Sequence, residues 1–284
     1  MTVDEAFERR ARLARRHHEN FPVGSFLLPR EHRGDVRAVY AFARTADDFA
    51  DETIAALGVP ERLELLERWE AQLDLCLKGE SAVPEFLALR QAIEGRGLPL
   101  EPFRDLVSAF KQDVTKGRYA NFEEVKDYCR RSANPIGRLV LQIFGCCDED
   151  ALRLSDRICT ALQLANFWRD VGVDLDKDRI YLPQDEMEGF GVTEEGLKER
   201  RFDEGFLRLM QFQVRRAREI FDSGRRLPNM VGSGLRTEIR VTWLGGVEIL
   251  NKIEWLGFDT LRRRPRLSKL DFIRLLARAV LRRW

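Results

Sequence analysis

The sequence reads ICTALQLANFWRDVGVD from Ile158 to Asp174. A helix turns by about 100° per residue, which places Gln163, Asn166, Asp170 and Asp174 within roughly 80° of one another. The other positions are nearly all apolar, so the segment predicts a buried helix with one polar stripe. A buried polar group costs free energy unless a partner satisfies it. The stripe therefore requires a partner, either elsewhere in the chain or in a ligand.

A second acidic stripe lies near the start of the chain, in VRAVYAFARTADDFADE at 36–52. Four charged side chains fall within roughly 100° of one another on a helix, with Tyr40 on the same stripe: Arg44, Asp47, Asp48 and Asp51. Carboxylates gathered on one face repel one another and are costly to bury without cations. We expect the two stripes to face each other with metal ions between them. A buried polar network without metal is the alternative.

The donor atoms of both stripes are oxygens, which suit Mg²⁺ held by one or two carboxylates and by substrate phosphate oxygens. Such ions neutralise a leaving diphosphate. Direct contacts to phosphate are expected from cationic side chains, because their N–H donors match phosphate oxygens. The candidates are Arg44, Lys116, Arg118 and Arg179.

The whole chain is typical of an all-α protein. It has 284 residues, of which 44% are hydrophobic and 33% charged, with only ten prolines. Helical periodicity runs through 61–77, 101–112, 151–174 and 206–226, and no alternating strand pattern is present. Turn residues mark the breaks, for example at 145–150 and 181–191. No linker or repeat divides the chain, so we expect one domain over 1–284.

The charge and cysteine patterns limit the partners and the compartment. Five cysteines without CxxC spacing indicate free thiols in a reducing compartment. No signal peptide and no run of about 20 apolar residues is present, so a cytoplasmic protein is expected. Residues 261–284 carry nine Arg or Lys against one acid. The amphipathic basic stretch 267–284 fits either a peripheral contact with the inner membrane face or packing on the core. No nucleic-acid partner is expected.

Both stripes resemble motifs of the squalene/phytoene synthase family. YAFARTADDFAD at 40–51 resembles the first Asp-rich motif, and QLANFWRDVGVD at 163–174, followed by RIYLP at 179–183, resembles the second. The resemblance implies an isoprenoid synthase fold, a helical bundle around a deep apolar cavity. It also implies an isoprenoid diphosphate substrate and two or three Mg²⁺ ions.

The resemblance further implies roles for individual residues. The expected metal ligands are Asp47, Asp51, Asn166, Asp170 and Asp174. The expected substrate-binding residues are Tyr40, Arg44, Asp48, Lys116, Arg118, Gln163, Arg169 and Arg179. Tyr128 and Asn134 join the metal ligands in the expected catalytic set.

One branch of the family matches in more detail. The stretches at 20–29, 42–48, 128–137 and 166–170 resemble the bacterial hydroxysqualene synthases of the hopanoid pathway. That branch converts presqualene diphosphate and water into hydroxysqualene and diphosphate. The chain departs from the wider family in having SANP at 132–135, Val173 for Glu, Asp178 for Gly, and Gly245-Gly246 where relatives place a Tyr.

The segment Asn134-Pro135 has two interpretations. In the first, the Asn134 carboxamide holds the water that attacks the cation. In the second, the Asn-Pro pair shapes a bend, because proline interrupts a helix. The sequence leaves both open.

Two other functions compete with water capture. The first is head-to-head prenyl transfer, as in presqualene diphosphate, squalene or phytoene synthases. The second is a non-catalytic family member that acts in assembly, although such a protein is expected to lose the metal ligands that this chain retains. The chain has no GxGxxG motif after a strand, so no nicotinamide cofactor is expected.

Overall fold

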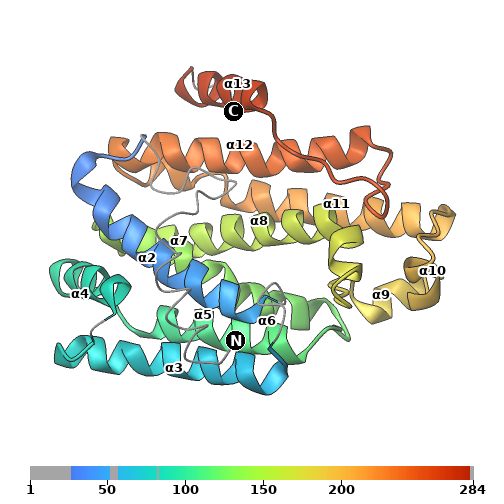
Figure 1. Ribbon diagram of the computed structural model, residues 1–284. Helices are drawn as coiled ribbons and strands as arrows, with labels where there is room; N and C mark the ends of the chain where they lie inside the picture. Colours follow the sequence, from blue (N-terminus) through green and yellow to red (C-terminus); the bar gives the residue numbers. More distant parts are fainter. Residues whose placement is uncertain (1–26, 52–56, 82, 282–284) are drawn as a thin grey trace. The chain divides into compact units, whose positions relative to one another are not determined.

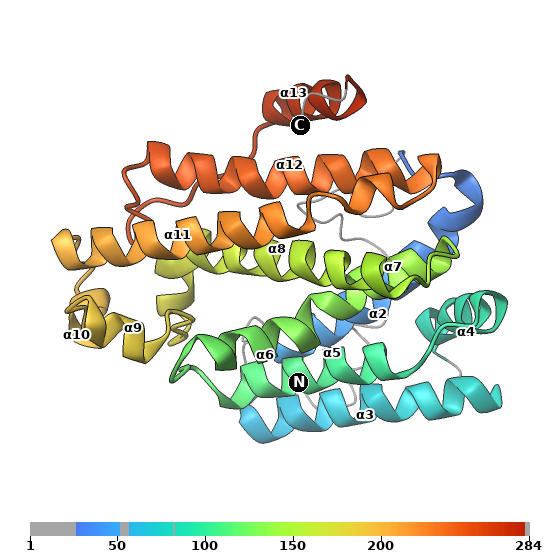
Figure 2. The same cartoon turned by 180° about the vertical axis from the view of Figure 1, so that it is seen from behind.

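The computed structural model describes residues 27–51, 57–81 and 83–281. The described part of the chain is all-α, as predicted, and its only strand-like pairing is an isolated bridge between Arg118 and Ile180. Figures 1 and 2 show the helices from opposite sides. The long helices are α2 (Arg30–Ala50), α3 (Val59–Lys78), α4 (Pro84–Arg96), α5 (Glu101–Thr115), α6 (Phe122–Ser132), α7 (Asn134–Ile143), α8 (Glu149–Leu175), α11 (Glu204–Gly224), α12 (Ser233–Trp255) and α13 (Lys269–Val280). The short ones are α9 (Gln184–Gly189), α10 (Glu194–Lys198) and the 3₁₀ turn Leu227–Asn229.

Contacts divide the chain into two compact units, 1–115 with 135–152 and 116–134 with 153–284. In the first unit, α2 packs against α3, α4 and α5. The Phe42 ring lies 5.8 Å from Trp69, and the edges of Phe86 and Phe103 meet it at 5.7 and 5.3 Å. The Trp69 indole donates to the Phe42 carbonyl. These aromatic contacts fix the buried side of α2, and with it the side on which the acidic stripe lies.

The second unit holds α8 from Arg153 onward, and the composition of this helix predicts that it is buried. Its core residues include Trp168, with no exposed surface. α12 runs between α11 and α13 in both views (Figures 1 and 2). Gly246 explains how α12 fits, because a Cβ there would lie 2.3 Å from Phe221 of α11 and 2.8 Å from Leu162 of α8. Gly246 is thus a packing requirement at this crossing.

The helix is interrupted where the sequence has Asn134-Pro135. α6 ends at Ser132, Ala133 forms a turn, and α7 begins at Asn134. The prediction of a turn over 181–191 is wrong in part, because α9 occupies 184–189.

Of the helices described, none is both long and apolar enough to pass through a membrane. The stretch 20–29 quoted for the branch resemblance falls mostly outside the described residues, as do the last three residues of 267–284.

Candidate functional site

The stripe on α2 is the accessible edge of an otherwise buried helix. Tyr40, Arg44, Asp47 and Asp51 are half-buried, at intervals of four, three and four residues. The residues between them are nearly all buried, because they face the aromatic core of the first unit. Asp47 keeps 46% of its side chain exposed. The stripe predicted from periodicity is therefore present and reachable by a ligand.

Asp48 differs from its neighbours on this helix. Its side chain is only 10% exposed and lies 2.9 Å from a guanidinium nitrogen of Arg44. Arg44 also approaches Asp47 at 3.2 Å. Asp48 therefore holds Arg44 in position, whereas Asp47 and Asp51 are accessible to a ligand.

The stripe on α8 is present in the second unit. Gln163, Asn166, Asp170 and Asp174 are half-buried, while the residues between them include fully buried Leu164 and Trp168. The helix shows one accessible polar face along about three turns, as its sequence predicts.

Asp170 is the most heavily engaged acid of this stripe. Arg169 and Arg264 each donate two hydrogen bonds to its two oxygens, all at 2.8 Å. Burial raises the pKa of the Asp170 carboxyl, but the hydrogen bonds from the two guanidinium groups outweigh that effect and lower the pKa below its ordinary value. Asp170 is therefore a firmly ionised carboxylate, which is the form that binds a divalent cation.

Arg264 reaches Asp170 because the segment after α12 lies directly against α8. The Gly172 N–H donates to the Thr260 carbonyl at 3.1 Å, and Arg200 donates to the carbonyls of Gly172 and Leu261 at 2.7 and 2.8 Å. A Cβ on Gly172 would lie 2.3 Å from the Leu261 oxygen. Sequence reasoning missed both Arg200 and Arg264. The one sequence signal for them is Gly172, because a glycine inside a long helix indicates that another segment lies close to it.

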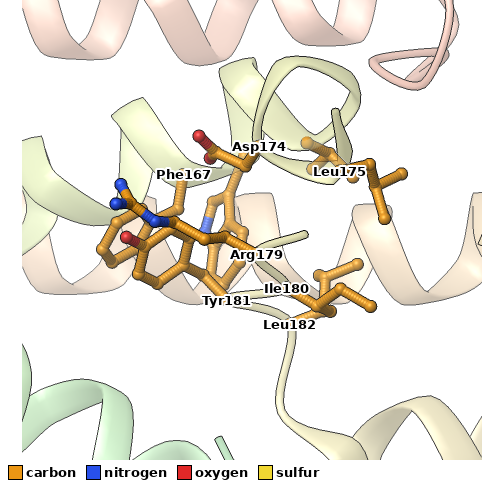
Figure 3. A pocket seen from close by; sticks show the side chains of 9 residues that line it. Phe167, Asp174, Leu175, Arg179, Ile180, Tyr181 and Leu182 are labelled. Carbon is orange, nitrogen blue, oxygen red and sulfur yellow. The ribbon is translucent and has the colours of Figure 1, made fainter. Parts of the chain in front are cut away.

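A small pocket lies at the C-terminal end of α8 (Figure 3). Asp174 and Arg179 are its charged residues, and apolar side chains and Tyr181 form most of the remaining wall. The Arg179 N–H donates to the Asp174 carbonyl at 2.9 Å, which fixes the turn that joins the two. The enclosed space is about the size of one water molecule. It does not hold a long isoprenoid chain.

Aromatic rings pack behind this pocket. The Phe167 and Tyr181 rings stack at 3.7 Å, and Tyr128 lies 5.7 Å from Phe167. Tyr119 stacks on Tyr181 at 5.4 Å. Tyr128 is only 3% exposed. The structure therefore places the predicted catalytic Tyr128 in a buried aromatic cluster that supports the pocket wall.

Two of the predicted phosphate-binding cations form ion pairs with carboxylates of the chain. Lys116 pairs with Glu124 at 2.9 Å, and Arg118 pairs with Asp178 at 2.6 Å and with Glu194 at 2.9 Å. The pKa of the Asp178 carboxyl is lowered by the hydrogen bond and charge of Arg118. Asp178 has φ of 52°, a conformation that glycine adopts more readily. The pairing with Arg118 accounts for an Asp at this position.

Asn134 is buried and fastened to α8. Its side-chain oxygen accepts a hydrogen bond from Thr160 at 3.0 Å, and the residue is 7% exposed. This contact gives Asn134 a structural role. This hydrogen bond uses the side-chain oxygen of Asn134 and not its amide N–H groups. Whether those N–H groups hold the attacking water stays a prediction.

The residues on α8 fit a magnesium ion by their chemistry. They offer an amide oxygen and two carboxylates on one accessible face of a buried helix. In the part of the chain described, no three His, Cys, Asp or Glu side chains surround a common point. Mg²⁺ bound through one or two carboxylates and substrate phosphates does not need such a cluster. The convergence of the two stripes stays a prediction, as does the deep apolar cavity.

Comparisons with known proteins agree with these observations. A model of the squalene/phytoene synthase family matches residues 14–271. The hydroxysqualene synthase of Sinorhizobium fredii is 37% identical over 259 residues, which cover 90% of this chain and 85% of that protein. The hydroxysqualene synthase of Rhodopseudomonas palustris is 35% identical over 257 residues, with the same coverage of the two chains.

Solved structures show the same fold. A squalene synthase from Alicyclobacillus acidocaldarius superposes with a TM-score of 0.81 at 42% identity, over 90% of this chain and 95% of that one. A dehydrosqualene synthase in complex with a ligand has a TM-score of 0.85 at 22% identity, over 99% and 98% of the two chains. The fold is that of the isoprenoid synthases. Since the family model spans the acidic stripes of both α2 and α8, the chain that carries them belongs to the squalene/phytoene synthase family.

Proposed function

We propose that this chain is a hydroxysqualene synthase, which converts presqualene diphosphate and water into hydroxysqualene and diphosphate. The observation that carries the proposal is the pair of accessible oxygen-rich stripes on α2 and α8. Two hydroxysqualene synthases that are 37% and 35% identical over 90% of the chain support the choice of reaction.

In this proposal, Asp47 and Asp51 of α2 and Asn166, Asp170 and Asp174 of α8 hold two or three Mg²⁺ ions. When bound, the ions supply positive charge that stabilises the departing diphosphate. Arg179, which shares the pocket with Asp174 (Figure 3), would donate to a phosphate oxygen. Arg44 has the same role on α2, held in position by the buried carboxylate of Asp48.

The chemistry then needs a site that shelters a carbocation until water arrives. The C–O bond to diphosphate breaks, leaving a cyclopropylcarbinyl cation that rearranges. A water oxygen forms the new C–O bond and releases one proton. Aromatic side chains such as Phe167 and Tyr181, which line the pocket, exclude water from it. We propose that the Asn134 amide holds the attacking water.

The deciding experiment is incubation of the purified chain with presqualene diphosphate and Mg²⁺, followed by identification of the lipid product. Hydroxysqualene and diphosphate in equal amounts are expected. Asp170→Asn is expected to lower turnover by roughly 10- to 100-fold, in line with loss of a metal ligand or its direct support. Glu149→Gln, at an exposed position on the same helix, is the matched control and is expected to retain full turnover.

The main alternative is head-to-head condensation of two isoprenoid diphosphates. It is favoured by the 42% identity to a squalene synthase, and by phytoene synthase 2 of Solanum lycopersicum at 29% identity over 94% of this chain. Presqualene diphosphate, squalene or phytoene formed from farnesyl or geranylgeranyl diphosphate would establish it. No diphosphate release from any of these substrates would favour the non-catalytic assembly role.

The same assay tests Asn134. If the residue holds water, Asn134→Ala lowers the hydroxysqualene fraction and leaves the rate of diphosphate release less affected. Thr160→Val is the matched control, because it removes the hydrogen bond to the Asn134 oxygen but keeps the amide. If both variants released diphosphate more slowly, were less stable and still formed the same product, Asn134 would have only a structural role.

A further inference from the structure

The C-terminal helix α13 has two apolar faces. One face packs on α12, with Leu275 1% exposed and Ala279 fully buried. The opposite face carries large apolar side chains that stay open, and we call these residues the outer stripe: Leu270 (75% exposed), Ile273 (63%), Val280 (61%) and Leu281 (65%). Packing on α12 therefore explains only half of the apolar pattern in this segment.

The outer stripe is continuous and is bordered by cations. Its four members fall within about 100° of one another around the helix axis. Exposed Lys269 borders it on one side, and exposed Arg274 and Arg278 border it on the other. An apolar band between rows of basic residues is typical of a helix that lies in the plane of a membrane interface.

Trp255 at the end of α12 lies near the first turn of α13. Its side chain is 68% exposed. Lys252 lies 5.9 Å from the Trp255 ring and 3.0 Å from Asp271 in the first turn of α13, so the tryptophan is near the start of the outer stripe. Exposed tryptophan is characteristic of the level of lipid head groups, where one part of the ring is apolar and the N–H is wet.

Exposed apolar side chains are concentrated at Trp255 and the outer stripe. Five of the nine large apolar side chains that are exposed in the described part of the chain belong to Trp255 and the outer stripe. The other four are spread over α3, α4 and the loop after the 3₁₀ turn. Single exposed apolar residues are ordinary, whereas a contiguous patch indicates an interaction site.

The charge around the stripe selects its partner. On α13 and just before it the exposed cations are Arg266, Lys269, Arg274 and Arg278, whereas the one acid, Asp271, is 13% exposed and paired with Lys252. Anionic lipid head groups attract such a segment. A second copy of the chain would bring the same positive charge to the contact, and like charges oppose that association.

We propose that the outer stripe and Trp255 dock on the anionic surface of a lipid bilayer, with α13 lying parallel to the membrane. α13 is held to the rest of its unit for this purpose by defined contacts. Ser268 and Asp271 form a capping box, Asp271 pairs with Lys252, and Arg274 pairs with the buried Glu248. The surface is thus presented as a fixed part of the second unit, and the proposal goes beyond the reaction assigned above.

The test is co-sedimentation of the full chain with phosphatidylcholine vesicles that contain or lack phosphatidylglycerol. Binding is expected to vesicles with phosphatidylglycerol and to weaken as salt is raised. Ile273→Ser combined with Val280→Ser is expected to reduce partitioning by roughly tenfold or more. Leu77→Ser combined with Leu87→Ser is the matched control, because it removes exposed apolar surface from α3 and α4 instead.

Charge is tested in the same way. Lys269→Gln is expected to weaken binding by roughly fivefold, the effect of one cation near an anionic surface. Lys78→Gln, an exposed cation at the end of α3, is the control and is expected to have no effect. All these positions are exposed, so unchanged circular dichroism and melting are expected for every variant.

Three results would overturn the proposal. One is equal partitioning of the wild-type chain and the Ile273→Ser/Val280→Ser variant. Another is binding that does not depend on phosphatidylglycerol or on Lys269. The third is a dimer in sedimentation velocity that the same double substitution dissociates, since the outer stripe would then belong to a second copy.

Discussion

Asp170 has a carboxylate whose hydrogen-bonding capacity is filled. A carboxylate offers about four acceptor sites, and Arg169 and Arg264 together donate four hydrogen bonds. A divalent cation that binds Asp170 must therefore displace at least part of one guanidinium group. Arg264 is 34% exposed and Arg169 only 14%, so Arg264 is the group that leaves more readily.

This competition predicts that Arg264→Gln binds divalent cations more tightly in the absence of substrate. Removing one positive charge beside Asp170 favours the incoming cation, and a gain of about tenfold is expected, which is about 1.4 kcal/mol. The measurement is Mn²⁺ binding followed by the electron paramagnetic resonance signal of the free ion. No turnover is needed.

The neighbouring Arg263 provides the control. Arg263→Gln makes the same change in net charge at an exposed position one residue away, so its Mn²⁺ affinity is expected to match the wild type. Weaker or equal binding by Arg264→Gln would show that this residue does not compete with the cation.

For single residues, the periodicity of the sequence predicted which side chains share a helix face. The accessible stripes on α2 and α8 follow from the 3.6-residue repeat, because that repeat alone decides which side chains share a face. It did not predict Arg264, which lies 94 residues from Asp170. It also did not distinguish buried Asp48 from open Asp47, since the Arg44 pairing depends on how far α2 is turned into its core.

At the scale of elements, the contact between α8 and the segment after α12 depends on one glycine. Gly172→Ala is expected to destabilise the protein by roughly 1–3 kcal/mol, because the new Cβ would meet the Leu261 oxygen at 2.3 Å and Arg200 at 2.5 Å. It is also expected to loosen the pairing of Arg264 with Asp170. Chemical denaturation measures the first effect.

Gly95→Ala in α4 is the matched control for this substitution. Nothing lies within 4 Å of a Cβ at Gly95, so alanine is expected to stabilise the helix by about 0.5–1 kcal/mol. If both variants were stabilised alike, the segment after α12 would not need the close approach at Gly172.

Long helices were easier to predict from the sequence than short ones. The predicted helix at 61–77 lies within α3, and that at 151–174 within α8. The six-residue α9 was missed because a helix of that length is marginal alone. It is held by Glu186, which accepts hydrogen bonds from Gln213 and Arg216 of α11. Such support comes from distant residues and leaves no local pattern.

At the scale of the molecule, carboxylates in ion pairs couple stability to acid. The pKa values of Asp170, Asp127 and Asp178 lie below their ordinary range, and that of Asp271 is lowered to about 2 by the Ser268 N–H, Lys252 and the Ser268 hydroxyl. A carboxyl whose pKa is lower in the folded state stabilises that state above its unfolded pKa of about 3.9. The contribution is lost as the pH falls through the folded pKa.

The free energy of unfolding is therefore expected to fall between about pH 4 and pH 2. Asp271→Asn removes one part of this dependence, along with the acidic half of the α13 capping box, at a cost of about 1 kcal/mol at neutral pH. Near pH 2 the cost is expected to shrink, because the wild-type carboxyl is then about half protonated. Glu149→Gln, at an exposed carboxyl, is expected to show little change at either pH. Denaturant titrations from pH 2 to pH 7 measure all three curves. A cost for Asp271→Asn that stayed constant over this range would mean that the ionised carboxylate does not hold α13 in place.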